Sequence, residues 1–465
     1  MSKSTIFFIL SLLPFVSAGQ DIPTITIHAD FFPKDASVYS YPVSPRSFMR
    51  GTMEIKGTNT LPQEDLFYLH GELRVDSILS GGKKLDYDSE KVLYRYDYSR
   101  VALRTEIQET YPKDRPLHIH YSGFFNPSGA RSLSDYMRID RREGVFLRSY
   151  GYSLWFPVFL EPNDEPYRAN FEEVNLSLPA GMKGLVSGKL LKETESRERY
   201  HCSWHPGNSN IRNIQCTARP WEILSDKGVQ IHYMENQAAA AQVLDFVQEL
   251  KDLFQTHLRQ IESSGTLYVM EMPKYGNISN NNITGISSEL FANFEEELFP
   301  KLTIAHELVH PYVQLPLQKA NPFYALFMEG FPSFFQVWAL HKTHPDSVYN
   351  IHRHMQRLEK SYLQKKETGK TSRGFDLPEE KPILSITAEE IGHYKDKFIL
   401  NDRVWLFLYG LWQEMGDARF EAFLSELLNK QDMNYADFES TILKYLPKHE
   451  EKLAIWLKGT AYPVE

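Results

Sequence analysis

Hydrophobic and polar residues follow two different patterns along the chain. Up to about residue 222, short runs alternate apolar and polar positions, as in TITIHADFF at 24–32 and PLHIHYSGFF at 116–125. Gly, Pro, Asn and Asp residues separate these runs. A period of two between frequent turn residues is typical of antiparallel β-strands. The first part of the chain is therefore predicted to be an antiparallel β-domain.

From residue 235 the apolar residues recur at helical spacing. NQAAAAQVLDFVQELKDLFQTHL predicts a helix over 236–258, and TLYVMEM predicts one strand over 266–272. A polar loop, PKYGNISNNNIT, follows at 273–284. Helical patterns then dominate, through the segment TIAHELVHPY and at 321–342, 402–416, 418–430 and 450–459. The sequence predicts an α+β protein in which a β-domain over 19–222 precedes a mostly helical domain over 223–465.

The first eighteen residues have a different character. Lys3 precedes an apolar run over 6–16, and the small residues V-S-A end at Ala18. This order is typical of a secretory signal peptide, so residues 1–18 are predicted to direct export to the periplasm or the extracellular space. No later stretch is apolar for long enough to span a bilayer.

Length and charge narrow the possible classes. A chain of 465 residues exceeds the size of one ordinary core, which favours two domains. A hydrophobic content of 42% with 24% charged residues is that of a globular protein. The formal net charge of -9 argues against nucleic-acid binding, which needs a basic face.

Cys202 and Cys216 are the two cysteines of the chain and flank a turn rich in Gly, Asn and Ser. In an exported protein this arrangement predicts a disulfide that closes a hairpin. The alternative is a metal pair with His201 or His205. The disulfide is favoured because the spacing between the cysteines exceeds the short spacing typical of structural zinc sites.

The segment HELVH contains the pattern H-E-x-x-H, formed by His306, Glu307 and His310. On a helix, positions four apart differ by about 40° around the axis, so the two imidazoles point the same way and can reach one Zn²⁺. Glu307 is rotated by about 100°, which leaves its carboxylate beside the metal as a base for a water molecule. An ordinary helix with two partly buried histidines would match the same five residues.

A third ligand favours the zinc interpretation. Catalytic zinc uses three protein ligands and one open position. Glu329 lies eighteen residues beyond HELVH, in FMEGFPSFFQVWAL. A carboxylate on so apolar a helix is costly unless it is paired or bound to a metal. We therefore expect His306, His310 and Glu329 to hold one zinc ion.

This combination resembles the M1 metallo-aminopeptidases, a gluzincin family that includes leukotriene A4 hydrolase. The resemblance rests on H-E-x-x-H, eighteen residues, and E-G-F-x-S with two aromatic residues. The stretch LWFPVFLEPNDEPYRANFEEVNLSLPAGMKGLVSGKL is similar to the end of the family's N-terminal β-saddle domain, and AIWLKGTAYP resembles the close of its thermolysin-like catalytic domain. The resemblance implies these two domains and does not extend to the β-sandwich and helical-bowl domains of larger relatives.

The chain departs from the family in the loop that holds the substrate's free amino group. Family members carry G-x-M-E-N, whose glutamate grips the amine. YGNISNNNITGISSELF takes its place here, and one match puts Asn282 at the glutamate position while another puts Ser279 there. An asparagine still accepts a hydrogen bond but lacks the charge. Asn282 and the backbone near Gly285 are the predicted substrate-binding positions, the latter for an oxyanion.

Two further departures concern a tyrosine and a proline. The family's oxyanion-binding tyrosine aligns with Asn401, and Tyr394, about two turns earlier, is the candidate replacement. Pro311 follows His310 directly. Because proline has no N–H and crowds the preceding turn, the helix is predicted to kink or end there.

The sequence thus predicts an exported zinc metallopeptidase that acts on peptides at or near the N-terminus. Glu307 is the expected general base. Two alternatives stay open at this point. One is a zinc-binding relative with weak or no peptidase activity that binds peptides or partners. The other is a zinc hydrolase of substrates that are not peptides.

Overall fold

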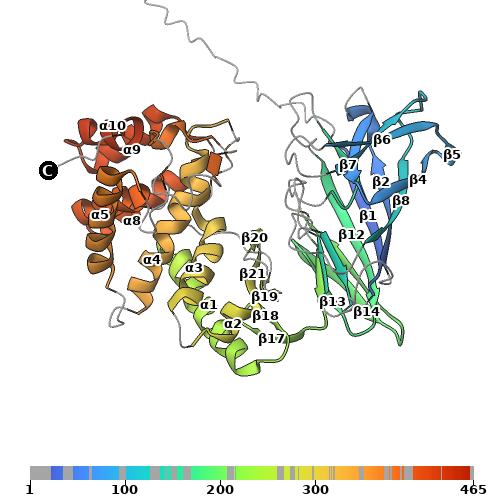
Figure 1. Ribbon diagram of the computed structural model, residues 1–465, viewed down its shortest axis with the longest axis horizontal. Coiled ribbons are helices and arrows are strands. Elements are labelled where there is room, and N and C mark those ends of the chain that lie inside the picture. Colours follow the sequence, from blue (N-terminus) through green and yellow to red (C-terminus); the bar gives the residue numbers. More distant parts are fainter. Residues whose placement is uncertain are drawn as a thin grey trace, which may run out of the picture. The chain divides into compact units, whose positions relative to one another are not determined.

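A computed structural model (Figure 1) describes the greater part of the 465 residues. The described residues are 22–34, 46–61, 65–93, 101–125, 137–141, 144–147, 154–160, 169–206, 214, 216–258, 266–272, 278–280, 282–295, 298–313, 315, 317, 320–344, 350–370, 376–377, 380–387, 390–391, 402–430 and 432–460. The predicted signal peptide lies outside them. The chain forms two compact units, Met1–Arg219 and Pro220–Glu465.

The first unit is built from β-sheets. Its largest sheet has eight strands, in the order β14 (Lys189–Glu195), β15 (Arg199–His205), β12 (Asn170–Pro179), β1 (Thr24–Phe32), β2 (Ser47–Lys56), β8 (Leu117–Phe125), β4 (Leu73–Ser80) and β5 (Lys83–Lys84). A second sheet has the order β13 (Lys183–Val186), β16 (Cys216–Arg219), β10 (Gly144–Leu147) and β9 (Met137–Asp140). A third has the order β11 (Val158–Phe159), β3 (Leu66–His70), β7 (Val101–Ile107) and β6 (Tyr87–Leu93), and a short 3-10 turn covers Thr58–Thr60.

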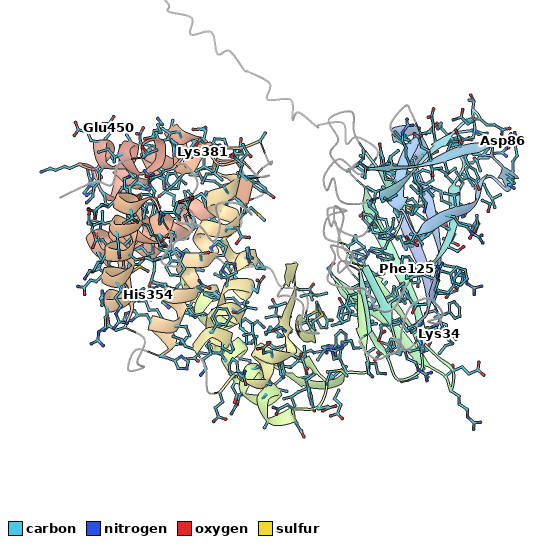
Figure 2. All side chains as sticks on the ribbon, in the orientation of Figure 1. Lys34, Asp86, Phe125, His354, Lys381 and Glu450 are labelled. Atoms are coloured by element: carbon cyan, nitrogen blue, oxygen red, sulfur yellow. The ribbon has the colours of Figure 1, made fainter. Side chains whose placement is uncertain are left out.

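Strand β1 lies inside the large sheet. It pairs antiparallel with β2, opposite Met53 at Ile27, and parallel with β12, opposite Val174. Ile27, Met53 and Val174 are fully buried, whereas His28 is exposed, as the alternating pattern predicts. Polar side chains at the sheet margins point into solvent, as Asp86 does just before β6 (Figure 2). The alternation of the sequence therefore sets which side of the sheet is covered.

The two cysteines differ from expectation, because both are free, buried thiols. Cys202 lies on β15 of the large sheet and Cys216 on β16 of the second sheet, so they are not partners across one hairpin. Burial raises the pKa of the Cys202 thiol to about 12 and also raises that of Cys216, which keeps both protonated. His201 and His205 project from the opposite face of β15, away from Cys202, which excludes the alternative metal pair.

The second unit contains a five-stranded sheet with the order β17 (Glu222–Asp226), β18 (Val229–Tyr233), β19 (Leu267–Met272), β21 (Ile283–Ser287) and β20 (Ile278–Asn280). The three middle strands are parallel and the two outer strands are antiparallel to their neighbours. The sequence predicts one strand here, over 266–272. The other strands are short, and β20 and the first two residues of β21 fall in the predicted polar loop.

Helices make up the rest of the second unit. They are α1 (Gln237–His257), α2 (Ser288–Ala292), α3 (Leu298–Val313), the π-turn η4 (Leu326–Gly330), α4 (Phe331–Thr343), α5 (Ile351–Thr368), the 3-10 turn η5 (Ile383–Ser385), α7 (Val404–Met415), α8 (Asp417–Leu428), α9 (Tyr435–Tyr445) and α10 (Glu450–Lys458). Among the described residues, no helix is long and apolar enough to cross a membrane. The predicted α+β class, a β-domain followed by a mostly helical one, is confirmed.

Helices α1, α3 and α4 pack together and form the frame for the candidate site. Asn236 begins α1 by accepting a hydrogen bond from the N–H of Ala239 at 2.9 Å. The buried face of α1 then covers the sheet and α3. Two polar helices, α5 and α9, are absent from the prediction. In α5 the buried positions are Ile351, Met355 and Tyr362, too few to give a strong apolar period.

Candidate metal centre

Helix α3 carries the HELVH segment in its second half. Ile304, Ala305 and Leu308 are buried in the core of the second unit. Burial of these residues fixes the orientation of α3. Because His306 and His310 are four residues apart on the helix, their side chains project from the same side. The two imidazole centroids lie 5.0 Å apart, with their planes at 87°.

Pro311 lies inside α3, and the helix continues to Val313. The helix therefore does not end at Pro311 itself. Proline removes the one N–H that would bond the Glu307 carbonyl, but its fixed φ suits a helix, so the helical path continues for two further residues. Tyr312 anchors this turn, since its buried ring lies 5.3 Å from that of Phe254 in α1.

Glu329 comes from the π-turn η4, which leads directly into α4. The N–H of Phe331 bonds the carbonyl of Leu326, five residues earlier, which is the π-type bond. Pro332 is the second residue of α4 and has no N–H for the carbonyl of Met328. Such one-turn π-bulges commonly lie at functional sites. The wider turn sets the direction in which Glu329 leaves the helix.

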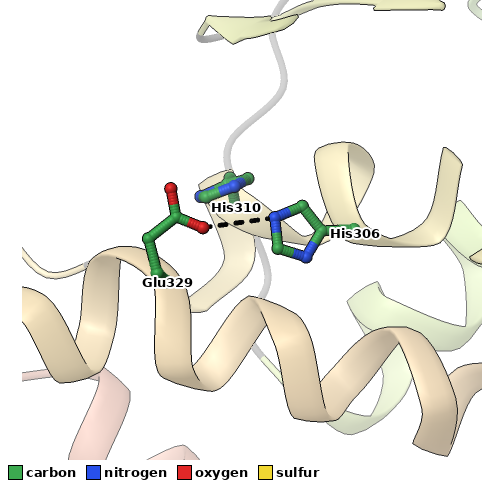
Figure 3. A group of neighbouring side chains, drawn as sticks. All are labelled: His306, His310 and Glu329. Carbon is green, nitrogen blue, oxygen red and sulfur yellow. Dashed lines mark ion pairs between the residues drawn. The ribbon is translucent and has the colours of Figure 1, made fainter. Parts of the chain in front are cut away.

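The three predicted ligands come together from these two segments. Figure 3 shows His306 and His310 on α3 facing Glu329. Nε2 of His306 lies 3.4 Å from Oε2 of Glu329, and one ligand atom from each of the three residues lies within 4.8 Å of the other two. A tetrahedral zinc ion with bonds of 2.0–2.1 Å separates its ligand atoms by about 3.3 Å. The distance between His306 and Glu329 fits this geometry.

The chemistry of the donor atoms also fits zinc. Two imidazole nitrogens and one carboxylate oxygen form a common catalytic ligand set with one position left open. The side chains of His306 and Glu329 are 10% and 17% exposed, so the site is shielded yet reachable. Glu307 is half-buried on the same helix, next to the first ligand. These residues can hold the ion, and Glu307 is adjacent to His306 in the sequence of α3.

The predicted substrate loop has a definite structure where it is described. Asn282 donates its amide Nδ2 to the carbonyl of Thr266 at 2.8 Å, and its own carbonyl accepts the N–H of Tyr268. The side chain expected to meet a substrate amine thus bonds the start of β19. Asn282 therefore holds the loop to the sheet.

Gly285 lies in β21, between two strands. It pairs with Met270 of β19 on one side and with Ile278 of β20 on the other. The N–H of a residue in an inner strand points to one of its neighbouring strands, so this amide is directed into the sheet. Of the described strands, β20 is the one at this margin of the sheet, and both β20 and β21 pack against α3. Among the described strands, the outer edge of the sheet on this side belongs to β20, which packs against the helix that carries His306 and His310.

Two of the predicted positions cannot be compared with the structure, and two features of the structure were not predicted from the sequence. Tyr394 and Asn401 fall outside the described residues. The π-turn at Glu329 was not anticipated, although Pro332 three residues later was a signal for an altered helical turn. The edge strand β20 was not predicted, because it lies in a polar segment without the alternation of apolar and polar residues that indicates a strand.

No family model matches the chain, and no characterised protein matches it in sequence. Solved structures do share its fold. An M1 zinc metallopeptidase from Deinococcus radiodurans aligns over 96% of this chain and 96% of its own, with a TM-score of 0.60 and 15% identity. A variant of that enzyme bound to the substrate Tyr-Ser-Ala gives a TM-score of 0.61 at 15% identity, over 96% and 95% of the two chains.

Yeast leukotriene A4 hydrolase in complex with bestatin is also similar. It aligns with 95% of this chain and 69% of its own, with a TM-score of 0.57 and 15% identity. At these identities the comparisons establish the architecture. The chain has the fold of the two-domain M1 zinc metallopeptidases, with a His-His-Glu group in its helical unit.

Proposed function

We propose that the protein is a zinc-dependent metallopeptidase that removes residues at or near the N-terminus of peptides. The observation that carries the proposal is the group of His306, His310 and Glu329, with ligand-sized spacing, in a fold shared with M1 zinc metallopeptidases. Those three residues hold the metal. When bound, zinc acts as a Lewis acid that makes a water molecule more acidic and polarises a carbonyl oxygen.

Glu307 performs the proton transfers. Its position next to His306 on α3 places a carboxylate beside the ligand set. It accepts the proton of the attacking water and passes this proton to the nitrogen of the departing amine. General acid–base catalysis of this kind contributes about 10²–10⁴ to the rate.

The backbone of the peptide is proposed to bind at β20. Among the described strands of the sheet, β20 has a neighbour on one side. The outer side of such a strand offers N–H and C=O groups to an extended peptide, which adds to the sheet as a further strand. Because β20 packs against α3, a peptide bound there runs beside the metal ligands.

Short peptides are the first substrates to test, since a structural neighbour was captured with Tyr-Ser-Ala. The loop of this chain carries Asn282 or, by another match, Ser279 where the family's amine-binding glutamate is expected, and the side-chain amide of Asn282 donates to the carbonyl of Thr266. We therefore propose weaker discrimination between free and blocked N-termini than a charged residue would give. Tyr394 is proposed as the hydroxyl that stabilises the oxyanion.

The proposal is tested with purified protein, metal analysis and a mixed peptide library read by mass spectrometry. We expect one zinc per chain and products shortened from the N-terminus. Glu307→Gln should retain zinc and lose about 10²–10⁴ of kcat. Glu198→Gln makes the same chemical change at an exposed position in the first unit and should leave kcat unchanged.

Each of the other possible results would assign a different activity to this protein. Internal cleavage of N-blocked peptides would replace the exopeptidase with an endopeptidase. Zinc binding without peptide turnover, with Glu307→Gln indistinguishable from the parent protein, would indicate a binding protein. Turnover confined to substrates such as epoxides would indicate another hydrolase on the same metal.

Export is the remaining part of the proposal. The order of Lys3, the apolar run at 6–16 and Ala18 supports cleavage after the signal. Mass spectrometry of the protein from the exported fraction should give a mature chain that begins at Gly19 or Gln20. A chain that retains Lys3 in that fraction would contradict it.

A further inference from the structure

Gly330 follows Glu329 directly and has no conformational need to be glycine. Its φ of -67° and ψ of -50° are those of an ordinary helix. Alanine is a better helix former than glycine at such a position. Some other constraint must therefore exclude a side chain here.

The constraint is the close approach of α7. A methyl group added to Gly330 would lie 2.9 Å from Cγ1 and 3.3 Å from Cγ2 of Val404, the first residue of α7, and 3.3 Å from Cδ1 of Leu326 in the π-turn itself. Normal carbon–carbon contacts are about 3.5–4.0 Å, so one of the two segments would have to move by about 0.6 Å. Val404 is fully buried and, being β-branched, has few rotamers with which to avoid the contact.

The residues that precede Val404 in the chain fix its position. The preceding residue, Arg403, has a fully buried side chain that donates to the carbonyls of Ile455 and Gly459 and, at 3.1 Å, to Oε1 of Glu380. These bonds join the start of α7 to the end of α10. Asp402, one residue earlier, pairs with Lys365 of α5. These bonds oppose a shift of the start of α7 when a methyl group is added at Gly330.

The turn that carries Glu329 is the more yielding partner. A π-turn interrupts the regular i to i+4 ladder, and Pro332 removes a further bond just beyond it. Metal–ligand distances tolerate errors of about 0.2 Å. A displacement of about 0.6 Å at Gly330 would exceed this tolerance at the neighbouring carboxylate.

We propose that Gly330 and Val404 form a positioning contact for the metal site. The absence of a side chain at Gly330 lets α7 press on the π-turn, and this contact holds the Glu329 carboxylate 3.4 Å from His306. The inference rests on the proposed role of Glu329 as a zinc ligand. It makes the first residue of α7, which binds no metal, a determinant of metal affinity.

The test compares Gly330→Ala, Val404→Ala and the double variant. Zinc affinity is measured by competition with a chelator, and the visible spectrum of the cobalt-loaded protein reports ligand geometry. Gly330→Ala should weaken zinc binding about 10–100-fold, the range seen when groups that orient ligands are changed. Val404→Ala loosens the contact without creating a clash and should weaken zinc binding mildly, by up to about threefold, and the double variant should return to this range because the clash with Val404 is gone.

Gly410→Ala is the matched control. Gly410 lies in α7, and an added methyl there meets no atom within 4 Å, so zinc affinity should not change. If Gly330→Ala does not fold, the double variant, which lacks the clash, should fold and bind zinc as the parent protein does. Parental affinity in a folded Gly330→Ala, or a double variant as weak as the single one, would overturn the proposal.

Glu329→Gln separates this inference from the proposed function. Loss of zinc binding in Glu329→Gln with parental affinity in Gly330→Ala overturns the positioning contact alone. Parental zinc affinity in Glu329→Gln overturns both, because Glu329 is then not a ligand.

Discussion

Replacing Glu380 with glutamine tests how the helical unit holds its buried charges. Glu380 accepts hydrogen bonds from Tyr362 at 2.8 Å and from Arg403 at 3.1 Å, and pairs with Lys366 at 2.8 Å. The Arg403 side chain is 0% exposed and that of Glu380 is 15% exposed. Glu380→Gln keeps the shape and one acceptor oxygen but removes the negative charge that faces the Arg403 guanidinium.

The expected loss follows from this burial. Removing one partner of a buried ion pair costs about 3–5 kcal/mol. The lower end applies, since glutamine still accepts a bond and Arg403 keeps the carbonyls of Ile455 and Gly459. We expect a loss of about 3 kcal/mol. The second unit has 246 residues, from 220 to 465. For a unit of this size, a loss of 1 kcal/mol in stability lowers the Tm by about 2–4 °C. Its Tm should fall by about 6–12 °C.

Thermal unfolding followed by far-ultraviolet circular dichroism measures this loss, because the α-helices of the described residues lie in the second unit. Glu451→Gln, at an exposed position of α10, should change stability by less than about 0.5 kcal/mol. In an Arg403→Met background the effect of Glu380→Gln should shrink to about 1 kcal/mol or less, since the buried positive charge that Glu380 faces is gone. A Tm within about 2 °C of the parent protein would refute the reasoning.

Three further predictions address the metal, pH and the first unit. Free zinc at 100 times its Kd should stabilise the second unit by about 2.7 kcal/mol in a thermal shift assay, and His310→Gln should abolish this; no shift in the parent protein would contradict a zinc site. Burial lowers the pKa of His232 to about 3, so below its ordinary value near 6.5 the unfolded chain takes up a proton that the folded chain does not. Stability should therefore fall between pH 6.5 and 3, by up to about 4 kcal/mol, and His232→Phe should flatten this part of a urea-denaturation pH profile; an unchanged slope would disprove it. A methyl group at Gly51 would lie 2.3 Å from the fully buried Tyr121 ring, so Gly51→Ala should destabilise the first unit by about 1–3 kcal/mol in calorimetry while zinc affinity is unchanged.

Much of the architecture was readable from periodicity. The strand predicted over 24–32 and the helix predicted over 236–258 correspond to β1 and α1, because each has a long run with one buried side. The cysteine pair was misjudged, since spacing along the chain says nothing about which sheet each strand joins. Register across sheets depends on distant segments such as β12 and β16.

The candidate site also has parts that the sequence could predict and parts that it could not. A helix imposes the relation between His306 and His310, so five residues of sequence suffice to predict it. The approach of Glu329 depends on how two helices pack; it was expected from the need for a third ligand and the cost of a carboxylate on an apolar helix, and the spacing was supported by the resemblance to a family. The positions of Asn282 and Gly285 depend on the pairing of β20 with β21. Strand β20 has three residues and β21 is buried at all five positions, so neither shows an alternation that a sequence pattern can detect.

The pairing of β1 has a consequence for how the protein folds. One neighbour, β2, follows closely in the chain, but the other, β12, begins at Asn170. A chain that emerges from its N-terminus therefore presents β1 as an uncovered strand edge until about 150 further residues have appeared. Contacts this distant in sequence slow folding and leave time for aggregation. Factors that shield extended segments during synthesis or export should improve the yield of folded protein.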